Sequence, residues 1–134
     1  MEFLKSALAA GLILAVLDAL WLGVIARDWL ASQLGPLMRE QIQPVPAILF
    51  YLIYAAGLGF FAVMPSLSDG NWMRALGVGA FFGLVAYATY DLTNLATIKG
   101  WPTPMVIVDL VWGAVLSGVS AAGGVLLLKQ FGWA

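Results

Sequence analysis

The sequence predicts an all-α integral membrane protein, a four-helix bundle with up-down topology. Of its 134 residues, 63% are hydrophobic and 10% are charged, whereas a soluble domain would carry about 25% charged residues. Four apolar stretches reach the length of about 20 residues that crosses a bilayer. Short polar or helix-breaking segments separate most of them. We therefore expect one transmembrane domain over residues 1–134.

The expected helices cover roughly residues 6–26, 46–64, 75–98 and 105–128. Lys5 precedes the first apolar run, as in a signal peptide, but the run is too long for one and carries Asp18 at its middle, so we interpret it as a retained helix. Segment 66–71 is a polar turn, and segment 99–104 combines helix breakers with the interfacial Trp101. Alternating helices place both chain ends on one side.

The connector between the first two helices is longer than a usual bundle loop. Apolar residues from Trp29 to Ile42 recur at roughly helical spacing with polar residues between them. We expect a short amphipathic helix over about 29–42 that lies in the membrane interface and is kinked near Gly35 and Pro36. An irregular loop is the alternative.

The distribution of basic residues assigns neither face to the cytoplasm, because each side of the membrane has three. Those on the side of the chain ends are Lys5, Arg74 and Lys129, and those on the opposite side are Arg27, Arg39 and Lys99.

Composition excludes several classes of chemistry. Six Lys/Arg and seven Asp/Glu give a net charge of −1, so no basic field is present to bind nucleic acid. Cys and His are both absent, which excludes disulfides, thiolate nucleophiles, Cys or His metal sites and His proton relays. We therefore expect no metal site and no cofactor. Any chemistry must come from carboxylates, hydroxyls, amides and aromatic rings.

Three of the seven acids, Asp18, Asp91 and Asp109, fall within expected spanning helices. Near the bilayer centre each costs about 2.5–3.5 kcal/mol on insertion scales, which makes an accidental placement a poor explanation. Counted at 1.5 Å per residue from the nearest helix end, they lie about 13, 12 and 8 Å below one face. The expected interfacial segment covers the same face.

Aromatic and amide residues share helical stripes with these acids. No Lys or Arg lies deep enough to pair with the acids unless Arg27 or Lys99 folds inward. Neighbouring donors, water, a bound cation or protonation must then satisfy the carboxyl groups. We expect Asp91 to be the central residue, with Tyr51 and Tyr54 of the second helix completing the wall. The candidate ligand-binding residues are Asp18, Trp21, Tyr87, Tyr90, Asp91, Asn94, Asp109 and Trp112.

Small residues recur at nearly every fourth position of the last helix, which allows a neighbouring backbone to approach closely. We interpret this stripe mainly as packing, and also as the face through which a homodimer would form. Its members are Gly113, Ser117, Ala121 and Gly124.

Three motifs together resemble a bacterial family of small predicted membrane proteins, the domain of unknown function numbered 2177 (DUF2177). They are Asp18-x-x-Trp21, the segment Tyr90-Asp91-Leu92-Thr93-Asn94 followed by Trp101-Pro102, and Asp109-x-x-Trp112-Gly113. The resemblance covers essentially the whole chain, and the Tyr-Asp-Leu-Thr-Asn segment is its specific part. It implies a bacterial inner-membrane location and names no activity.

Several functions fit this cluster. The first is binding of a membrane lipid or another amphipathic ligand, or of a cation. Acids without a buried Arg disfavour a phosphate or carboxylate head group and favour a hydroxyl, an amine or another cation. A lipid-modifying enzyme with an Asp acid/base pair is the second, although no known catalytic motif is present. A dimeric proton- or cation-coupled transporter and an accessory subunit of a larger complex are the others. The structural alternative is a hydrogen-bond network that only holds the helices together.

Overall fold

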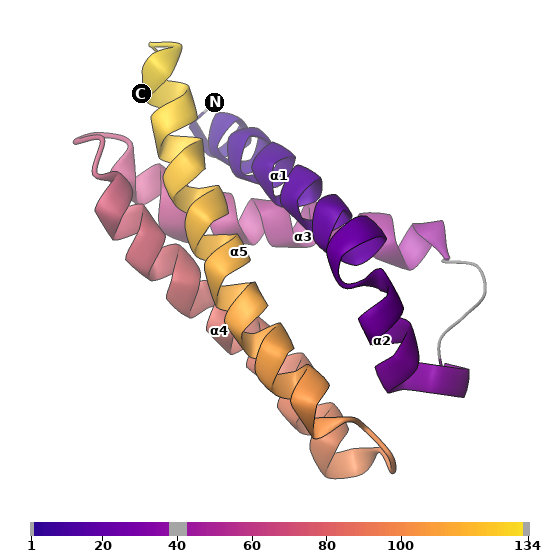
Figure 1. Ribbon diagram of the computed structural model, residues 1–134. Helices are drawn as coiled ribbons and strands as arrows, with labels where there is room; N and C mark the ends of the chain where they lie inside the picture. Colours follow the sequence, from indigo (N-terminus) through magenta and orange to yellow (C-terminus); the bar gives the residue numbers. More distant parts are fainter. Residues whose placement is uncertain (1, 38–42, 133–134) are drawn as a thin grey trace.

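The computed structural model describes residues 2–37 and 43–132. Within these ranges it has four helical segments that are long and apolar enough to cross a membrane. They are Glu2–Ile25, Pro44–Ser66, Trp72–Thr97 and Thr103–Gln130. Figure 1 shows the N- and C-terminal ends of the chain beside each other at one end of the bundle. The predicted all-α, up-down four-helix membrane bundle is confirmed.

The first two spans each consist of an α-helix that continues into irregular helical turns. The elements in order are α1 (Glu2–Leu20) with a π-helical turn, η1 (Trp21–Ile25); α2 (Arg27–Leu34) with a 3₁₀ turn, η2 (Gly35–Leu37); α3 (Pro44–Leu58) with a π-helical turn, η3 (Gly59–Val63), and a 3₁₀ turn, η4 (Met64–Ser66); α4 (Trp72–Thr97); and α5 (Thr103–Gln130).

The segment after the first span is helical where the structure describes it. Helix α2 ends at Leu34 and is followed by Gly35, whose φ of 56° favours glycine because a Cβ atom is strained there. The kink expected near Gly35 and Pro36 is thus a helix end followed by the 3₁₀ turn η2. Of the expected amphipathic helix over 29–42, residues 38–42 lie outside the described residues.

Helices α4 and α5 form a close antiparallel pair, because glycines on α4 let the two backbones meet. A Cβ atom added to Gly83 would lie 2.1 Å from the carbonyl oxygen of Gly113, and one added to Gly79 would lie 2.7 Å from that of Ser117. Neither position leaves room for a side chain. This is the small-residue packing typical of membrane helices.

Helix α1 packs against both α3 and α5 by the same means. A Cβ atom on Gly59 would lie 2.6 Å from the backbone nitrogen of Ala7, and one on Gly124 would lie 3.4 Å from that of Ala10. The buried core lies around these contacts and includes Leu14, Leu58, Leu116, Val125 and Leu128.

The stripe of small residues on α5 makes contacts inside the chain. Gly113 lies under the ring of Tyr87, and Gly124 faces Ala10 and Val63. Ser117 and Ala121 are fully buried. A homodimer through this stripe would therefore require α5 to give up its contacts with α4 and α1.

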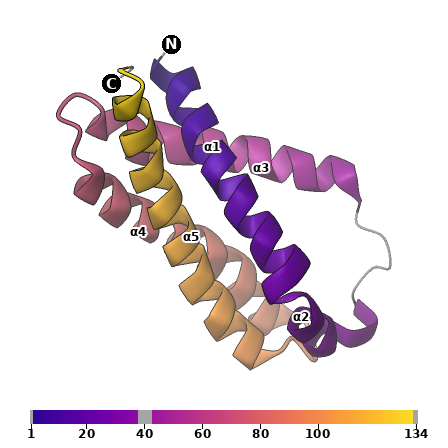
Figure 2. The same cartoon turned by 45° about the horizontal axis from the view of Figure 1, so that its top comes forward.

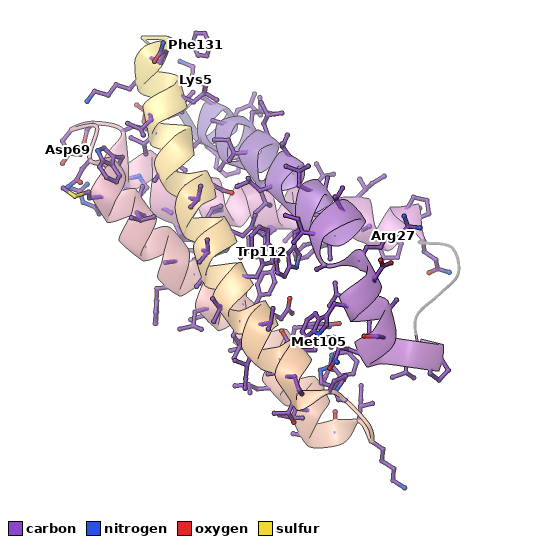
Figure 3. All side chains as sticks on the ribbon, viewed as in Figure 1. Lys5, Arg27, Asp69, Met105, Trp112 and Phe131 are labelled. Carbon is purple, nitrogen blue, oxygen red and sulfur yellow. The ribbon has the colours of Figure 1, made fainter. Side chains whose placement is uncertain are left out.

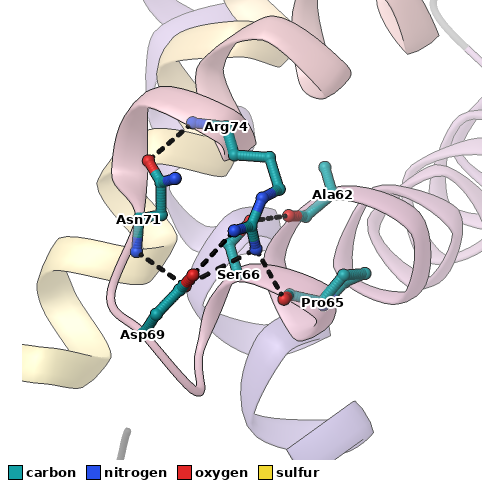
Figure 4. A network of polar contacts seen from close by, with 6 residues as sticks. All are labelled: Ala62, Pro65, Ser66, Asp69, Asn71 and Arg74. Atoms are coloured by element: carbon teal, nitrogen blue, oxygen red, sulfur yellow. Dashed lines mark hydrogen bonds and ion pairs between the residues drawn. The ribbon is translucent and has the colours of Figure 1, made fainter.

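A polar network closes the turn between η4 and α4 (Figure 4). The side chain of Asn71 accepts a hydrogen bond from the backbone N–H of Arg74 and caps α4. The guanidinium of Arg74 forms an ion pair with Asp69 at 2.6 Å and donates to the carbonyl oxygen of Pro65. The hydrogen bond from Arg74 lowers the pKa of Asp69 below its ordinary value.

Candidate functional site

A cavity of about 560 Å³ lies at the end of the bundle away from this turn. Residues from α1 and η1, α2, α3, α4 and α5 line it. Figures 1 and 2 show why the elements separate here, since α3 crosses the bundle and diverges from α4 and α5 toward its own N-terminal end. Its apolar and aromatic wall residues include Trp21, Leu22, Leu30, Leu34, Phe50 and Met105.

The polar groups on the wall are hydroxyls and carboxyls. All four tyrosines of the chain line the cavity, two from α3 and two from α4, together with Asp18 and Asp109. In Figure 3, Trp112 projects from α5 toward α1 and Met105 lies further along α5, while Arg27 lies at the outer edge, beside the junction of α1 and α2. The tyrosines are Tyr51, Tyr54, Tyr87 and Tyr90.

Asp18 accepts hydrogen bonds from two other helices. It is 4% exposed, the hydroxyl of Tyr51 on α3 donates to Oδ2, and the indole Nε1 of Trp112 on α5 donates to Oδ1 over 3.1 Å. An ionised carboxylate offers about four acceptor positions. Asp18 therefore links three helices and retains acceptor capacity toward the cavity that it lines.

Aromatic packing holds these donors in place. The rings of Trp21 and Trp112 are stacked, with centroids 4.5 Å apart and planes 14° apart. The hydroxyl of Tyr54 lies 2.5 Å from the Oγ of Ser117, and its ring meets that of Tyr87 edge to face with centroids 6.3 Å apart. Such rigid aromatic contacts fix side-chain positions around a site.

The two remaining acids occupy different positions. Asp109 lines the cavity, whereas Asp91 is fully buried and lies outside the cavity wall. Along the α4–α5 contact Gly83 meets Ser117 and Tyr87 meets Gly113, and the same register places Asp109 opposite Asp91. Within the described residues, neither oxygen of Asp91 has a hydrogen-bond partner, and the Nε1 of Trp101 has none either. The ring of Trp101 lies edge to face against Tyr90 at 5.8 Å.

Comparison with known proteins assigns the chain to a family. A family model described as a predicted membrane protein (DUF2177) matches residues 3–126. The chain belongs to this family. No curated protein and no solved structure matches it. Within DUF2177 the matched region includes all three intramembrane acids and every residue that lines the cavity.

The structure brings together six of the eight candidate residues of this DUF2177 chain. Asp18, Trp21, Tyr87, Tyr90, Asp109 and Trp112 line the cavity, and Asp91 and Asn94 do not. Asn94 is half-buried near the end of α4, where its backbone carbonyl accepts from the N–H of Ile98.

The sequence predicts that Tyr51 and Tyr54 turn their hydroxyls inward on a helix that completes the wall, and it gives Ser117 a packing role. The structure adds a hydrogen bond for each of these three side chains. The signal that could have found the tyrosines was present in the sequence: their spacing of three residues on a helix without charge places both hydroxyls on one face.

In the part of the chain that the structure describes, no basic residue forms an ion pair with Asp18, Asp91 or Asp109. Arg27 and Lys99, the cations expected to reach inward, are both exposed, and the ion pair found there joins Arg74 to Asp69. The same residues contain no group of three or more Asp or Glu side chains that could hold a metal ion. The site is therefore acidic, aromatic and suited to donors or positive charge.

Proposed function

We propose that this DUF2177 protein binds a lipid-like amphipathic molecule, with its head group at Asp18 and Asp109 and its tail along the apolar wall. The observation that carries the proposal is Asp18, a buried carboxyl that faces a largely apolar cavity of about 560 Å³. That volume lies within the roughly 300–1,000 Å³ range of small-molecule pockets.

The chemistry of the wall selects the head group. Asp18 and Asp109 lack a basic partner in the described chain, so a phosphate or carboxylate head would meet electrostatic repulsion. A hydroxyl or an amine donates hydrogen bonds to these groups instead. The stacked faces of Trp21 and Trp112 add a surface that attracts positive charge.

The position of the cavity supports membrane lipid as the source of the ligand. Several wall residues keep a large exposed fraction, among them Leu22 at 47%, Phe50 at 44% and Tyr90 at 54%. In a chain with four candidate membrane spans, such residues face lipid. An apolar tail could thus reach the cavity from within the bilayer. The resemblance to a bacterial family makes the bacterial inner membrane the proposed location.

Binding of three probes with the same chain length tests the proposal. Dodecanol, dodecylamine and dodecanoate would be titrated into the purified protein in lipid nanodiscs, with empty nanodiscs as the blank, and native mass spectrometry would count bound molecules. We expect the alcohol and the amine to bind and the carboxylate to be excluded. Asp18→Asn and Asp109→Asn should each weaken binding about tenfold or more, because hydrogen bonds to a charged group contribute about 1.5–3 kcal/mol.

Asp69→Asn serves as the matched control, because it makes the same substitution at an exposed site outside the cavity. It should bind like the natural chain. Equal binding of all three probes, or unchanged binding by both cavity variants with intact melting temperatures, would overturn the proposal and favour the purely structural network. A chemically altered probe in the mass spectrum would instead favour the lipid-modifying enzyme.

A further inference from the structure

Asp91 is a buried carboxyl group whose surroundings do not satisfy it. Its exposure is 0%, and within the described residues neither of its oxygens has a hydrogen-bond partner. Leaving a buried ionised carboxylate without partners is among the most costly arrangements in a protein interior. The indole Nε1 of Trp101, whose ring packs against Tyr90 beside Asp91, is also buried and has no hydrogen-bond partner in the described chain.

Asp109 is the residue of α5 that lies opposite Asp91. Along the α4–α5 contact Gly79 meets Ala121, Gly83 meets Ser117 and Tyr87 meets Gly113. The next pair in this register, about one turn further along each helix, is Asp91 and Asp109. Among the described residues, the other titratable groups that line the cavity with Asp109 are all acids or phenols. They are Asp18 from α1, Tyr51 and Tyr54 from α3, and Tyr87 and Tyr90 from α4. With no basic side chain paired to either carboxyl in the described chain, two ionised carboxylates would repel each other without compensation.

We propose that Asp91 and Asp109 hold one proton between them and that a cationic head group entering the cavity displaces it. The inference rests on the proposed function and makes its ligand class specific: a cationic amphipath bound in exchange for a proton. The cation lies at Asp109, which faces the cavity, and the proton leaves to bulk water. The net charge of the site is the same before and after the exchange.

The site has two states, one with the shared proton and one with the bound cation. Asp91 and Trp101 explain how it tolerates both. Before binding, the shared proton lets one carboxyl donate to the other, which removes the unpaired charge. After binding, both carboxyls are ionised, the cation neutralises Asp109, and the Trp101 N–H is the donor available to Asp91. Asp91 is therefore a positioning residue in this scheme, since the ligand contacts Asp109.

Proton release on binding of a permanently charged probe tests the inference. Decyltrimethylammonium carries the same charge at every pH, and decanol is its neutral counterpart. Calorimetric titration into the protein in nanodiscs, repeated in buffers of different ionisation enthalpy, counts the protons released. We expect close to one proton per bound cation and none per bound decanol. The affinity for the cation should rise about tenfold per pH unit while the pair holds its proton.

Asp91→Asn separates the exchange from binding itself. The asparagine amide can donate to Asp109 without a titrating proton, so this variant should bind decyltrimethylammonium with no proton release and with an affinity independent of pH. Cation binding by the natural chain without proton release would overturn the inference and leave the proposed function standing. Absence of binding by both probes would overturn the proposed function and this inference with it. The proton count on the natural chain decides the matter even where the variant does not fold.

Discussion

The two ends of the bundle are built on opposite principles. At the end with the chain termini, glycines and small residues bring backbones together, and Val125 and Leu128 are 0–1% exposed. At the other end, large aromatic side chains such as Trp21 and Trp112 stand between the helices, and a cavity with acids on its wall remains. Lipid tails are as apolar as leucine, so close packing rather than water exclusion stabilises a membrane bundle. The packed end can therefore carry most of the fold while the cavity end keeps acids on an open wall.

The largest expected effect comes from breaking the contact between α4 and α5. Gly83→Ala places a Cβ atom 2.1 Å from the carbonyl oxygen of Gly113 and 2.5 Å from the Oγ of Ser117, so the helices must separate. We expect a loss of about 3 kcal/mol or more in unfolding free energy, at the upper end of overpacking effects. Steric trapping in bicelles measures this energy.

Gly77→Ala is the matched control on the same helix, because an added Cβ atom there meets nothing within 4 Å. It should leave the unfolding free energy nearly unchanged. Equal losses for the two variants would mean that backbone flexibility, rather than close packing, explains the glycines of α4.

A leucine pair compares the two ends directly. Leu128 is 1% exposed in the packed end, and Leu22 lines the cavity and is 47% exposed. Leu128→Ala should cost about 2 kcal/mol, because the void it leaves is not filled and transfer from lipid contributes little. Leu22→Ala should cost much less, since its side chain already borders empty space. Similar losses in the same unfolding assay would contradict the division between a packed end and an open end.

The packed end was largely predictable from the sequence. Apolar stretches of spanning length and small residues at every fourth position of the last helix indicate membrane helices that pack closely. The use of that stripe was less predictable, because Gly113 and Gly124 look the same in sequence whether they face α4 and α1 or a second chain. Helical spacing gives the face on which a residue lies, and tertiary packing decides what covers that face.

For the cavity end, the sequence indicates which residues form the site but not how they are arranged in space. Three acids at similar depth on three helices indicate a shared site, and Asp18 and Asp109 do line one cavity. The sequence does not separate the roles of the three acids. Asp91 has the most polar neighbours on its helical stripe, yet in the structure it is fully buried and does not line the cavity. The cavity volume itself depends on how α3 diverges from the other helices (Figure 2), which no local pattern encodes.

The smallest expected effect concerns the exposed ion pair of Asp69 and Arg74 at the packed end. It contrasts with the buried acids of the cavity end, which have no basic partner in the described chain. Asp69 and Arg74 are 50% and 41% exposed, so water and salt screen their attraction. Because Arg74 lowers the pKa of Asp69 below 3.8 in the folded chain, the pair stabilises the fold above that pH and loses its effect as the pH falls through the lowered pKa. Asp69→Asn should therefore reduce the melting temperature slightly at pH 7, in neutral detergent at low salt, and this reduction should shrink as the pH falls below 3.8. The difference should vanish in 1 M salt, and Arg74→Gln should match it without adding to it in the double variant. A difference that does not shrink as the pH falls would show that Asp69 acts through the hydrogen bond it accepts from the N–H of Asn71, and not through its charge.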